Sequence, residues 1–315
     1  SLLELGLRLD WDEVISDVSI SPRLSFSHIL TEDGETKIAG GVGLYYDATN
    51  LNLITRPLDG RRVDFFYGED GQTLARPPLE TVFLVNEEEL KPPRFLNWSL
   101  GVEHKLPAAI YLRAEFLQRR GRNGFTFVDL ARGVFALRND RRDRYDSLQI
   151  TLRRAFRGGY TAMASYTRSR ARSNAVFEFD LDNPIFSGQA GGPLPWDTPN
   201  RLISTGWLPL GRGYDLGYSL EWRDGYPFSV INDNQQLVEP PNSRRFPAFF
   251  SLNTHVEKRF VFKSYKWALR VGFNNVTNRR NPTAVNNNIA SPEFLTFGGL
   301  QDRAFTGRIR FLGRR

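Results

Sequence analysis

Apolar and polar residues alternate along this 315-residue chain in repeated blocks of about ten residues, and this two-residue period restricts the fold more than any other feature. In one block, Tyr265, Trp267 and Leu269 share a face, whereas Lys266 and Arg270 lie on the other. Successive side chains of a β-strand point to opposite faces, so each block predicts a strand. The clearest blocks are 3–11, 96–102, 148–152, 214–222, 265–273 and 305–311. Because few segments show helical spacing, we predict an all-β chain.

Weaker blocks with the same period fill the gaps between these strands. They lie at 18–30, 37–46, 109–118, 160–169, 201–208 and 249–260. Together the two sets give about twelve strands, and a strand that crosses a bilayer needs about 9 to 11 residues. We therefore expect an antiparallel transmembrane β-barrel, to which this chain contributes about twelve strands.

Short and long connections between the predicted strands alternate along the chain. The short turns are expected at 31–36, 107–108, 157–159, 211–213 and 263–264, and the long segments at 47–94, 119–143, 170–200, 223–246 and 275–303. Unstructured loops of this length are unusual in a soluble domain. Outer-membrane barrels have short periplasmic turns and long extracellular loops, so the rhythm favours that architecture.

Composition excludes several other classes of protein. The chain has no cysteine, only three histidines, no long apolar run and a mean hydropathy of −0.41. These values exclude thiolate zinc sites, disulfide scaffolds and transmembrane helices. The sequence motifs of metalloproteases, serine hydrolases, phosphate-binding loops and dinucleotide-binding folds do not occur. We therefore expect no enzymatic activity, no cofactor and no bound metal.

Aromatic residues make up 13% of the chain, and many stand at the ends of apolar strand faces. Amphipathic rings at these positions are typical of the two girdles where a barrel meets the membrane interfaces. The predicted girdle residues are Trp11, Tyr160, Tyr166, Tyr214, Trp222, Tyr265 and Trp267. A soluble β-sandwich or propeller also alternates, but its dry core could not satisfy the many charged residues on the opposite faces. A water-filled lumen could.

The long segments and their borders carry the candidate ligand-binding residues. Guanidinium groups pair with carboxylates and phosphates, and exposed aromatic rings can stack on sugars or aromatic chelators. The candidates are Arg120, Arg142, Arg170, Trp196, Tyr226, Phe228 and Arg279. The simpler interpretation is that the arginines are solvated or contact acidic lipopolysaccharide, and that the aromatic residues pack the loops together.

Two further ligands receive less support. The chain carries a net charge of +7, but its basic residues are spread over strands and loops instead of forming one stripe, so we expect no nucleic-acid binding. Asp180 and Asp182 could bind calcium through hard oxygen ligands, although a solvated loop is the simpler interpretation.

Seven short strings, in the same order along the chain, resemble the barrel of TonB-dependent outer-membrane receptors, especially the large Oar-like ones with a carboxypeptidase-regulatory-like domain. The strings are GLRLD at 6–10, SPRLSFS at 21–27, GVGLYYD at 41–47, NWSLGVE at 97–103, DTPNR at 197–201, GYPFS at 225–229 and NNVTN at 274–278. The resemblance implies a 22-stranded barrel with a plug domain. Residues 1–315 would then be one C-terminal segment of that barrel, without the plug and the early strands.

The resemblance also implies a function. Such a receptor lies in the outer membrane of a Gram-negative bacterium and imports a scarce, bulky nutrient such as a ferric siderophore, a glycan or a peptide. Its partners would be the TonB complex through the plug, outer-membrane lipid and lipopolysaccharide, and the barrel assembly machinery. Two alternatives stay open: a passive porin of about twelve strands, and a soluble or surface adhesion β-protein.

Overall fold

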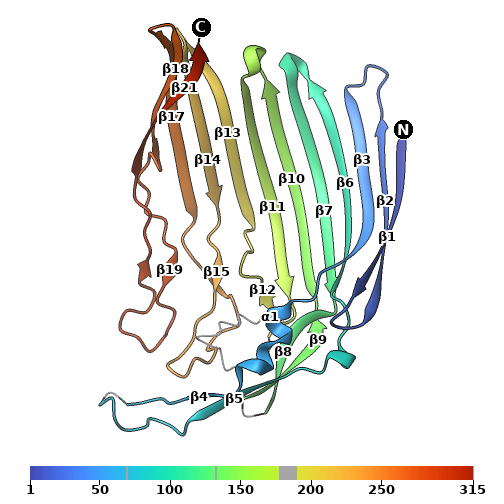
Figure 1. The fold of residues 1–315 in the computed structure, drawn as a ribbon, viewed down its shortest axis with the longest axis vertical. Helices are drawn as coiled ribbons and strands as arrows, with labels where there is room; N and C mark the ends of the chain where they lie inside the picture. The colour runs from blue at the N-terminus through green and yellow to red at the C-terminus, as the bar shows by residue number, and fades with distance from the viewer. Residues whose placement is uncertain (69, 132, 177–189, 315) are drawn as a thin grey trace.

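Twelve long antiparallel strands form one curved sheet, in which each strand pairs with the next one along the chain (Figure 1). The computed structural model describes residues 1–68, 70–131, 133–176 and 190–314. The strands are β1 (Leu2–Asp12), β2 (Asp17–Ile29), β3 (Thr36–Tyr46), β6 (Arg94–Leu106), β7 (Ile110–Arg122), β10 (Asp143–Ala155), β11 (Thr161–Ser173), β13 (Asn200–Gly211), β14 (Tyr214–Arg223), β17 (Phe249–Phe262), β18 (Tyr265–Asn274) and β21 (Ala304–Arg314). The predicted all-β, antiparallel fold is confirmed.

Short turns lie at one end of the sheet and long segments at the other (Figure 1). A two-residue turn joins Phe262 to Tyr265, and both of its residues, Lys263 and Ser264, have positive φ angles of 47° and 65°. Turns of this kind match the right-handed twist of antiparallel strands. One connection breaks the expected rhythm, because residues 13–16 join β1 to β2 by a short turn at the long-segment end.

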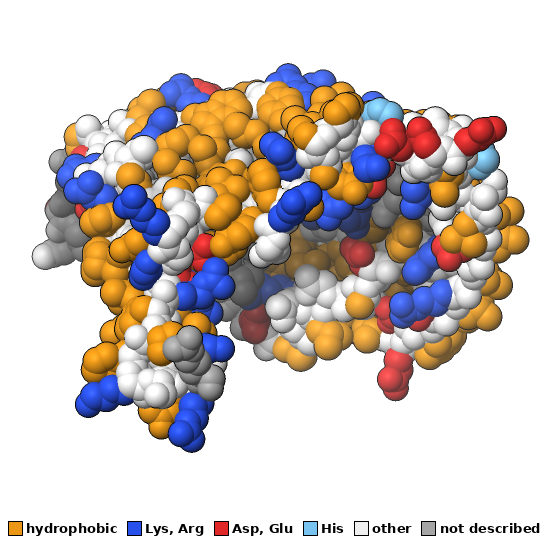
Figure 2. All heavy atoms as spheres, turned by 90° about the horizontal axis from the view of Figure 1, so that it is seen from above, with side chains coloured by type: hydrophobic (Ala, Val, Ile, Leu, Met, Phe, Trp, Pro, Cys, Tyr) orange, Lys and Arg blue, Asp and Glu red, His pale blue; other side chains and the backbone are white. Residues whose placement is uncertain are grey.

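The sheet has an apolar face and a polar face. On β1, Leu3, Leu5 and Leu7 point outward and are largely exposed, whereas Glu4 and Gly6 line a hollow on the opposite side. Seen from the short-turn end, hydrophobic side chains follow the outside of the arc and charged ones face its interior (Figure 2). We refer to the outer, apolar side as the convex face and to the inner, polar side as the concave face.

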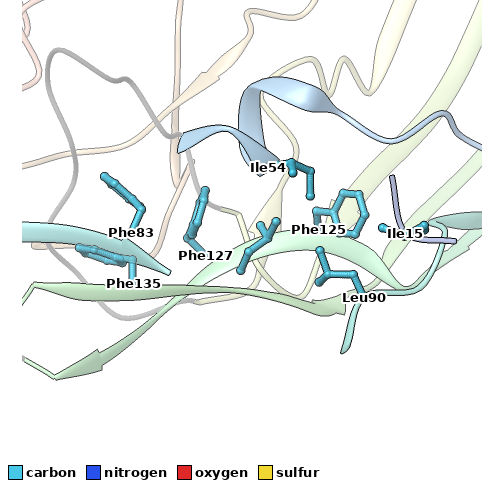
Figure 3. Close-up of a cluster of buried hydrophobic side chains, with 8 residues drawn as sticks. Ile15, Ile54, Phe83, Leu90, Phe125, Phe127 and Phe135 are labelled. Carbon is cyan, nitrogen blue, oxygen red and sulfur yellow. The ribbon is translucent and has the colours of Figure 1, made fainter. Parts of the chain in front are cut away.

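The long segments are not plain loops, which corrects the expectation from the sequence. Segments 47–94 and 119–143 build a second sheet from β4 (Arg62–Asp64), β5 (Leu79–Leu84), β8 (Gly124–Ala131) and β9 (Val134–Arg141). In this outer sheet β5 pairs in parallel with β9, although the two strands come from different segments. Phe83, Phe125, Phe127, Phe135 and Leu137 of this sheet form a buried hydrophobic cluster with Ile15, Ile54 and Leu90 of the adjoining connections (Figure 3).

The segments after β14 and β18 also pack together. They contain β15 (Pro227–Phe228), β16 (Arg244–Arg245), β19 (Ala284–Val285) and β20 (Phe297–Gly298). The Nδ2 of Asn287 donates to the carbonyl of Ser229 at 2.8 Å, and Asn288 donates to Asp233 at 2.7 Å. These bonds hold the two segments together at the end of the sheet. We call the two segments the loop layer.

In the residues that the structure describes, helical structure is confined to single turns. They are α1 (Leu51–Ile54) and the 3₁₀ turns Arg56–Asp59, Glu87–Glu89, Pro107–Ala109 and Arg157–Gly159; β12 (Gly192–Pro193) is a short strand that pairs with the end of β11. In the described part of the chain, no helix is both long enough and apolar enough to cross a bilayer.

Candidate functional site

A hollow of about 570 Å³ lies on the concave face, at the end of the sheet that carries the long segments. Its floor is built from odd-numbered residues of β10 and β11, which alternation directs to the concave side: Ser147, Gln149, Ser165, Thr167 and Ser169. Gln149 donates from Nε2 to the Oγ of Ser165 at 2.7 Å. The floor is therefore neutral and rich in hydroxyl groups. We call this cavity the loop-end hollow.

Aromatic side chains form the rim of the loop-end hollow. Trp196 is 52% exposed, and its ring centroid lies 5.6 Å from that of Tyr145 at an interplanar angle of 49°. Tyr226, which is 42% exposed, lines the hollow from the segment that follows β14. Gly225 precedes it, and a Cβ on that residue would collide with the carbonyl oxygen of Phe246. The glycine lets the two ends of the connection between β14 and β17 approach closely, and the backbone N–H of Phe246 donates to the carbonyl of Tyr226 at 2.9 Å.

Two arginines add charge to this hollow. Arg201 on β13 donates from Nε to Oε1 of Glu221 at 3.0 Å, so its charge is compensated locally. The Arg223 guanidinium lies 3.8 Å from the ring centroid of Tyr226 and 4.6 Å from that of Phe249. Stacking between two rings fixes the guanidinium, which also forms an ion pair with Glu221 at 3.7 Å and donates to the carbonyl of Asp224 at 3.4 Å. The hollow therefore offers hydroxyls, rings and one pre-oriented cation.

A second hollow, of about 730 Å³, lies on the concave face beside β1, β2, β3, β6 and β7. Charged residues of both signs line it: Glu4, Arg23, Lys37, Glu103, Arg113 and Glu115. Arg113 and Glu115 form an ion pair at 2.8 Å. A surface with this many charges matches a wet lumen, as expected from the sequence.

Solved structures of outer-membrane transporters and receptors have a fold similar to that of this chain. The chain aligns over 98% of its length with 42% of the outer membrane transporter YddB from Escherichia coli, at 14% identity and a TM-score of 0.69. It aligns equally far with 42% of the ferric enterobactin receptor PfeA from Pseudomonas aeruginosa, at 15% identity and a TM-score of 0.67. The ferric-catecholate import receptor Fiu from E. coli aligns over 93% of this chain and 35% of its own, at 12% identity and a TM-score of 0.57.

The fold is that of part of an outer-membrane receptor barrel. Residues 1–315 span less than half the length of each of these proteins, and all three are transporters or receptors. A scan against protein-family models and a search of the curated proteins found no match. The sheet therefore corresponds to part of the wall of such a barrel. Its convex face corresponds to the outside of the barrel, and its concave face corresponds to the lumen.

Two of the seven candidate ligand-binding residues, Trp196 and Tyr226, line the loop-end hollow. Phe228 does not, because it is only 7% exposed and packs edge-on against Phe246 at 5.3 Å between centroids. Its predicted role in binding is wrong for that reason. Arg142 lies exposed between β9 and β10, and Arg279 lies exposed after β18; neither lines this hollow.

Arg120 and Arg170 also lie elsewhere than expected. Arg120 lies opposite Leu96, and Arg170 opposite Asp146; all four residues share the convex face. The prediction that Arg120 and Arg170 lie in the lumen or in a loop is therefore wrong. Both residues lie on the convex face, where β7 and β11 extend beyond the apolar part of the wall. Alternation in the sequence did not indicate that charged residues would continue the convex face beyond its apolar part.

Three predicted girdle residues lie toward the long-segment end of the convex face. Tyr166, Leu202, Trp222 and Phe250 are cross-strand neighbours on β11, β13, β14 and β17, so they form one row across the wall. Trp11 is the penultimate residue of β1 and is 62% exposed.

Three other predicted girdle residues lie at the short-turn end. Tyr214 begins β14 and Tyr265 begins β18, each directly after a short turn. Trp267 lies opposite Phe260, and its ring centroid is 5.3 Å from that of Phe311. Phe260 and Phe311 extend this row beyond the residues expected from the sequence.

Tyr160 is the exception among the girdle candidates. Its hydroxyl donates at 2.6 Å to Asp215, which is buried on the concave face and also pairs with Arg259. Near it, the buried Glu257 pairs with Arg270 and Arg310 at 2.9 and 2.6 Å. Tyr160 therefore joins a cluster of compensated charges at the short-turn end of the lumen, and these contacts do not fit the predicted girdle role.

An ion pair also lies in the connection between β14 and β17. Arg244 donates two hydrogen bonds to Glu239, 3.0 Å to Oε2 and 2.6 Å to Oε1, and these bonds lower the pKa of the Glu239 carboxyl below its ordinary value. Across the described ranges, no group of three His, Asp or Glu side chains is placed to hold a metal ion. Asp180 and Asp182, the candidate calcium ligands, lie outside the described residues.

Proposed function

We propose that the chain is the C-terminal part of the barrel of an outer-membrane, TonB-dependent receptor of the Oar-like type. The observation that carries this proposal is the twelve-stranded wall with an exposed apolar convex face, a polar concave face and structured long segments at one end. Solved transporters and receptors of the outer membrane share this arrangement. The seven ordered sequence strings support the Oar-like assignment.

In this proposal the whole receptor carries a plug and further strands ahead of Ser1, and imports a scarce, bulky nutrient. The two aromatic rows mark the membrane interfaces, and the loop layer faces the outside. TonB acts through the plug, the barrel assembly machinery inserts the strands, and lipopolysaccharide surrounds the convex face. The loop-end hollow is the part of the substrate path that this chain supplies, and its hydroxyls, rings and cation suit a ferric siderophore, a glycan or a peptide.

The test is nutrient uptake by the whole receptor in a Gram-negative host that lacks its own receptors. Growth on panels of ferric chelates, oligosaccharides and peptides is compared with and without a functional TonB. We expect growth on one class of nutrient that requires both the receptor and TonB. Uptake of many small solutes without TonB would instead indicate a passive porin, and recovery of the folded protein in detergent-free buffer would indicate a soluble adhesin.

Tyr226→Ala tests the loop-end hollow once the nutrient class is known. Loss of an aromatic side chain that contacts a ligand costs about 2 kcal/mol, which is roughly a thirtyfold loss of affinity. The matched control is Tyr67→Ala, because Tyr67 is similarly exposed but lies on the β4–β5 segment and does not line the hollow. Equal losses of uptake affinity in the two variants would show that the hollow is not the binding site.

A further inference from the structure

Five arginines gather on the convex face of three neighbouring strands, just beyond the apolar band. They are Arg120 on β7, Arg144 on β10, and Arg168, Arg170 and Arg172 on β11. Cross-strand register puts them on one face, since Arg144 lies opposite both Arg120 and Arg172, and Arg168 lies opposite Leu148. We call this group the outer arginine patch.

Three of these arginines form a row of like charges. Arg120, Arg144 and Arg172 are direct cross-strand neighbours on β7, β10 and β11. Side chains in such positions have Cβ atoms about 4.5–5.5 Å apart, and like charges there are destabilising. A wall that places three guanidinium groups in line therefore gains from an anion that lies between them.

The wall itself supplies too little negative charge for the patch. Asp146 accepts from Arg120 at 2.7 Å and from Arg144 at 2.8 Å, which neutralises one of the five charges. Arg168 donates to the neutral amide oxygen of Asn200 at 2.7 Å. Among the residues that the structure describes, no ion pair engages Arg168, Arg170 or Arg172, and all three are exposed.

An apolar floor adjoins the charged groups. A shallow hollow of about 470 Å³ is lined by Arg168, Arg170 and Arg172 together with Phe116 and Leu148. Its two carboxylates, Asp146 and Asp197, are each paired with other arginines. Phe116 lies opposite Leu148 on the convex face, one step closer to the short-turn end than Asp146. A molecule in this hollow touches guanidinium groups and apolar side chains at once. A free inorganic anion would use only the first of these surfaces.

We propose that the outer arginine patch binds the phosphate groups of a phosphorylated lipid in the outer leaflet, whose acyl chains lie against Phe116 and Leu148. The inference rests on the proposed location of the barrel in the outer membrane. Guanidinium groups bind phosphate through two parallel hydrogen bonds, and basic residues at a membrane surface attract anionic headgroups. The lipid phosphates also relieve the repulsion within the row of Arg120, Arg144 and Arg172.

The test uses the whole receptor and its double variant Arg170→Gln with Arg172→Gln. Bisphosphorylated lipid A is the probe, and its retention after transfer to mild detergent is counted by native mass spectrometry. Each arginine near a charged headgroup contributes about fivefold to binding, so the double variant is expected to bind lipid A roughly twenty-five-fold more weakly. The control, Arg157→Gln with Arg212→Gln, removes the same charge from two short turns at the opposite end of the wall.

Retention of bisphosphorylated lipid A by the wild type and the control, but not by the patch variant, supports the proposal. Equal retention by all three proteins overturns it. Equal retention of dephosphorylated lipid A overturns it as well, because apolar contact would then suffice, and so does binding of inorganic phosphate as tight as that of the lipid. Failure of the wild type to insert into lipid vesicles would overturn the proposed location together with this inference, whereas the other contrary results leave nutrient uptake untouched.

Discussion

Replacing Ile150 with arginine is expected to lower the free energy of unfolding in lipid by about 2 kcal/mol, because this residue adjoins the row of Tyr166 and so lies between the interface and the bilayer midplane. Ile150 is 41% exposed on the convex face of β10, where it lies opposite Ala114 and Tyr166. If this face contacts lipid, the new guanidinium must enter hydrocarbon or distort the bilayer around it. Urea titration of the receptor in phosphatidylcholine vesicles, followed by tryptophan fluorescence, measures the change.

Gln149→Arg is the matched control for this prediction. Gln149 is the adjacent residue on the same strand, but it lines the loop-end hollow on the opposite face. The same arginine there meets water, so the free energy of unfolding should change by less than about 1 kcal/mol. Similar losses in the two variants would mean that both faces of β10 have the same surroundings, and a lipid-facing wall would be ruled out.

Phe135→Ala is expected to destabilise the outer sheet by about 3–5 kcal/mol and to leave the barrel wall intact. Phe135 is 1% exposed, and its ring stacks on Phe83 at 5.7 Å between centroids; Phe127 meets Phe83 edge-on at 5.0 Å. Truncation leaves a cavity in a small aromatic core (Figure 3), which cannot be refilled from elsewhere. Hydrogen exchange of peptides from β5, β8 and β9 should accelerate, while that of β10 and β11 stays slow.

The control for the outer sheet is Phe65→Ala. Phe65 lies just after β4 and is 55% exposed, so its loss leaves no cavity, and we expect a change within about 0.5 kcal/mol. Unchanged exchange in the Phe135 variant would show that the outer sheet is not held by this core. Faster exchange in β10 and β11 as well would show that wall and outer sheet unfold as one unit.

The sequence predicts the wall well because every wall strand carries the same local signal. Alternation at 265–273 and the turn at Lys263 and Ser264 depend on neighbouring residues alone, so both can be seen without the fold. The outer sheet could not be predicted in this way. Its core joins Ile15, Phe83 and Phe135, which come from three connections, and its parallel β5–β9 pair has no local signature.

The candidate site was only partly predictable, for a related reason. Residue type suggested that Trp196, Tyr226 and Phe228 could bind a ligand, but burial of Phe228 depends on Phe246 and Phe297, which approach from distant parts of the chain. Arg223 was missed because its position between Tyr226 and Phe249 exists only in three dimensions. The convex position of Arg120 and Arg170 follows from strand register, which alternation alone leaves open.

The central claim is that the convex face of this sheet contacts lipid and the concave face contacts water. Residues 1–315 contain no cysteine, so single cysteines introduced at residues 147 to 152 can be spin-labelled in a receptor whose remaining sequence is made free of cysteine. In lipid vesicles we predict that residues 148, 150 and 152 are accessible to oxygen dissolved in the bilayer, and residues 147, 149 and 151 to a water-soluble nickel chelate. Equal accessibility of both sets to the nickel chelate would contradict the account.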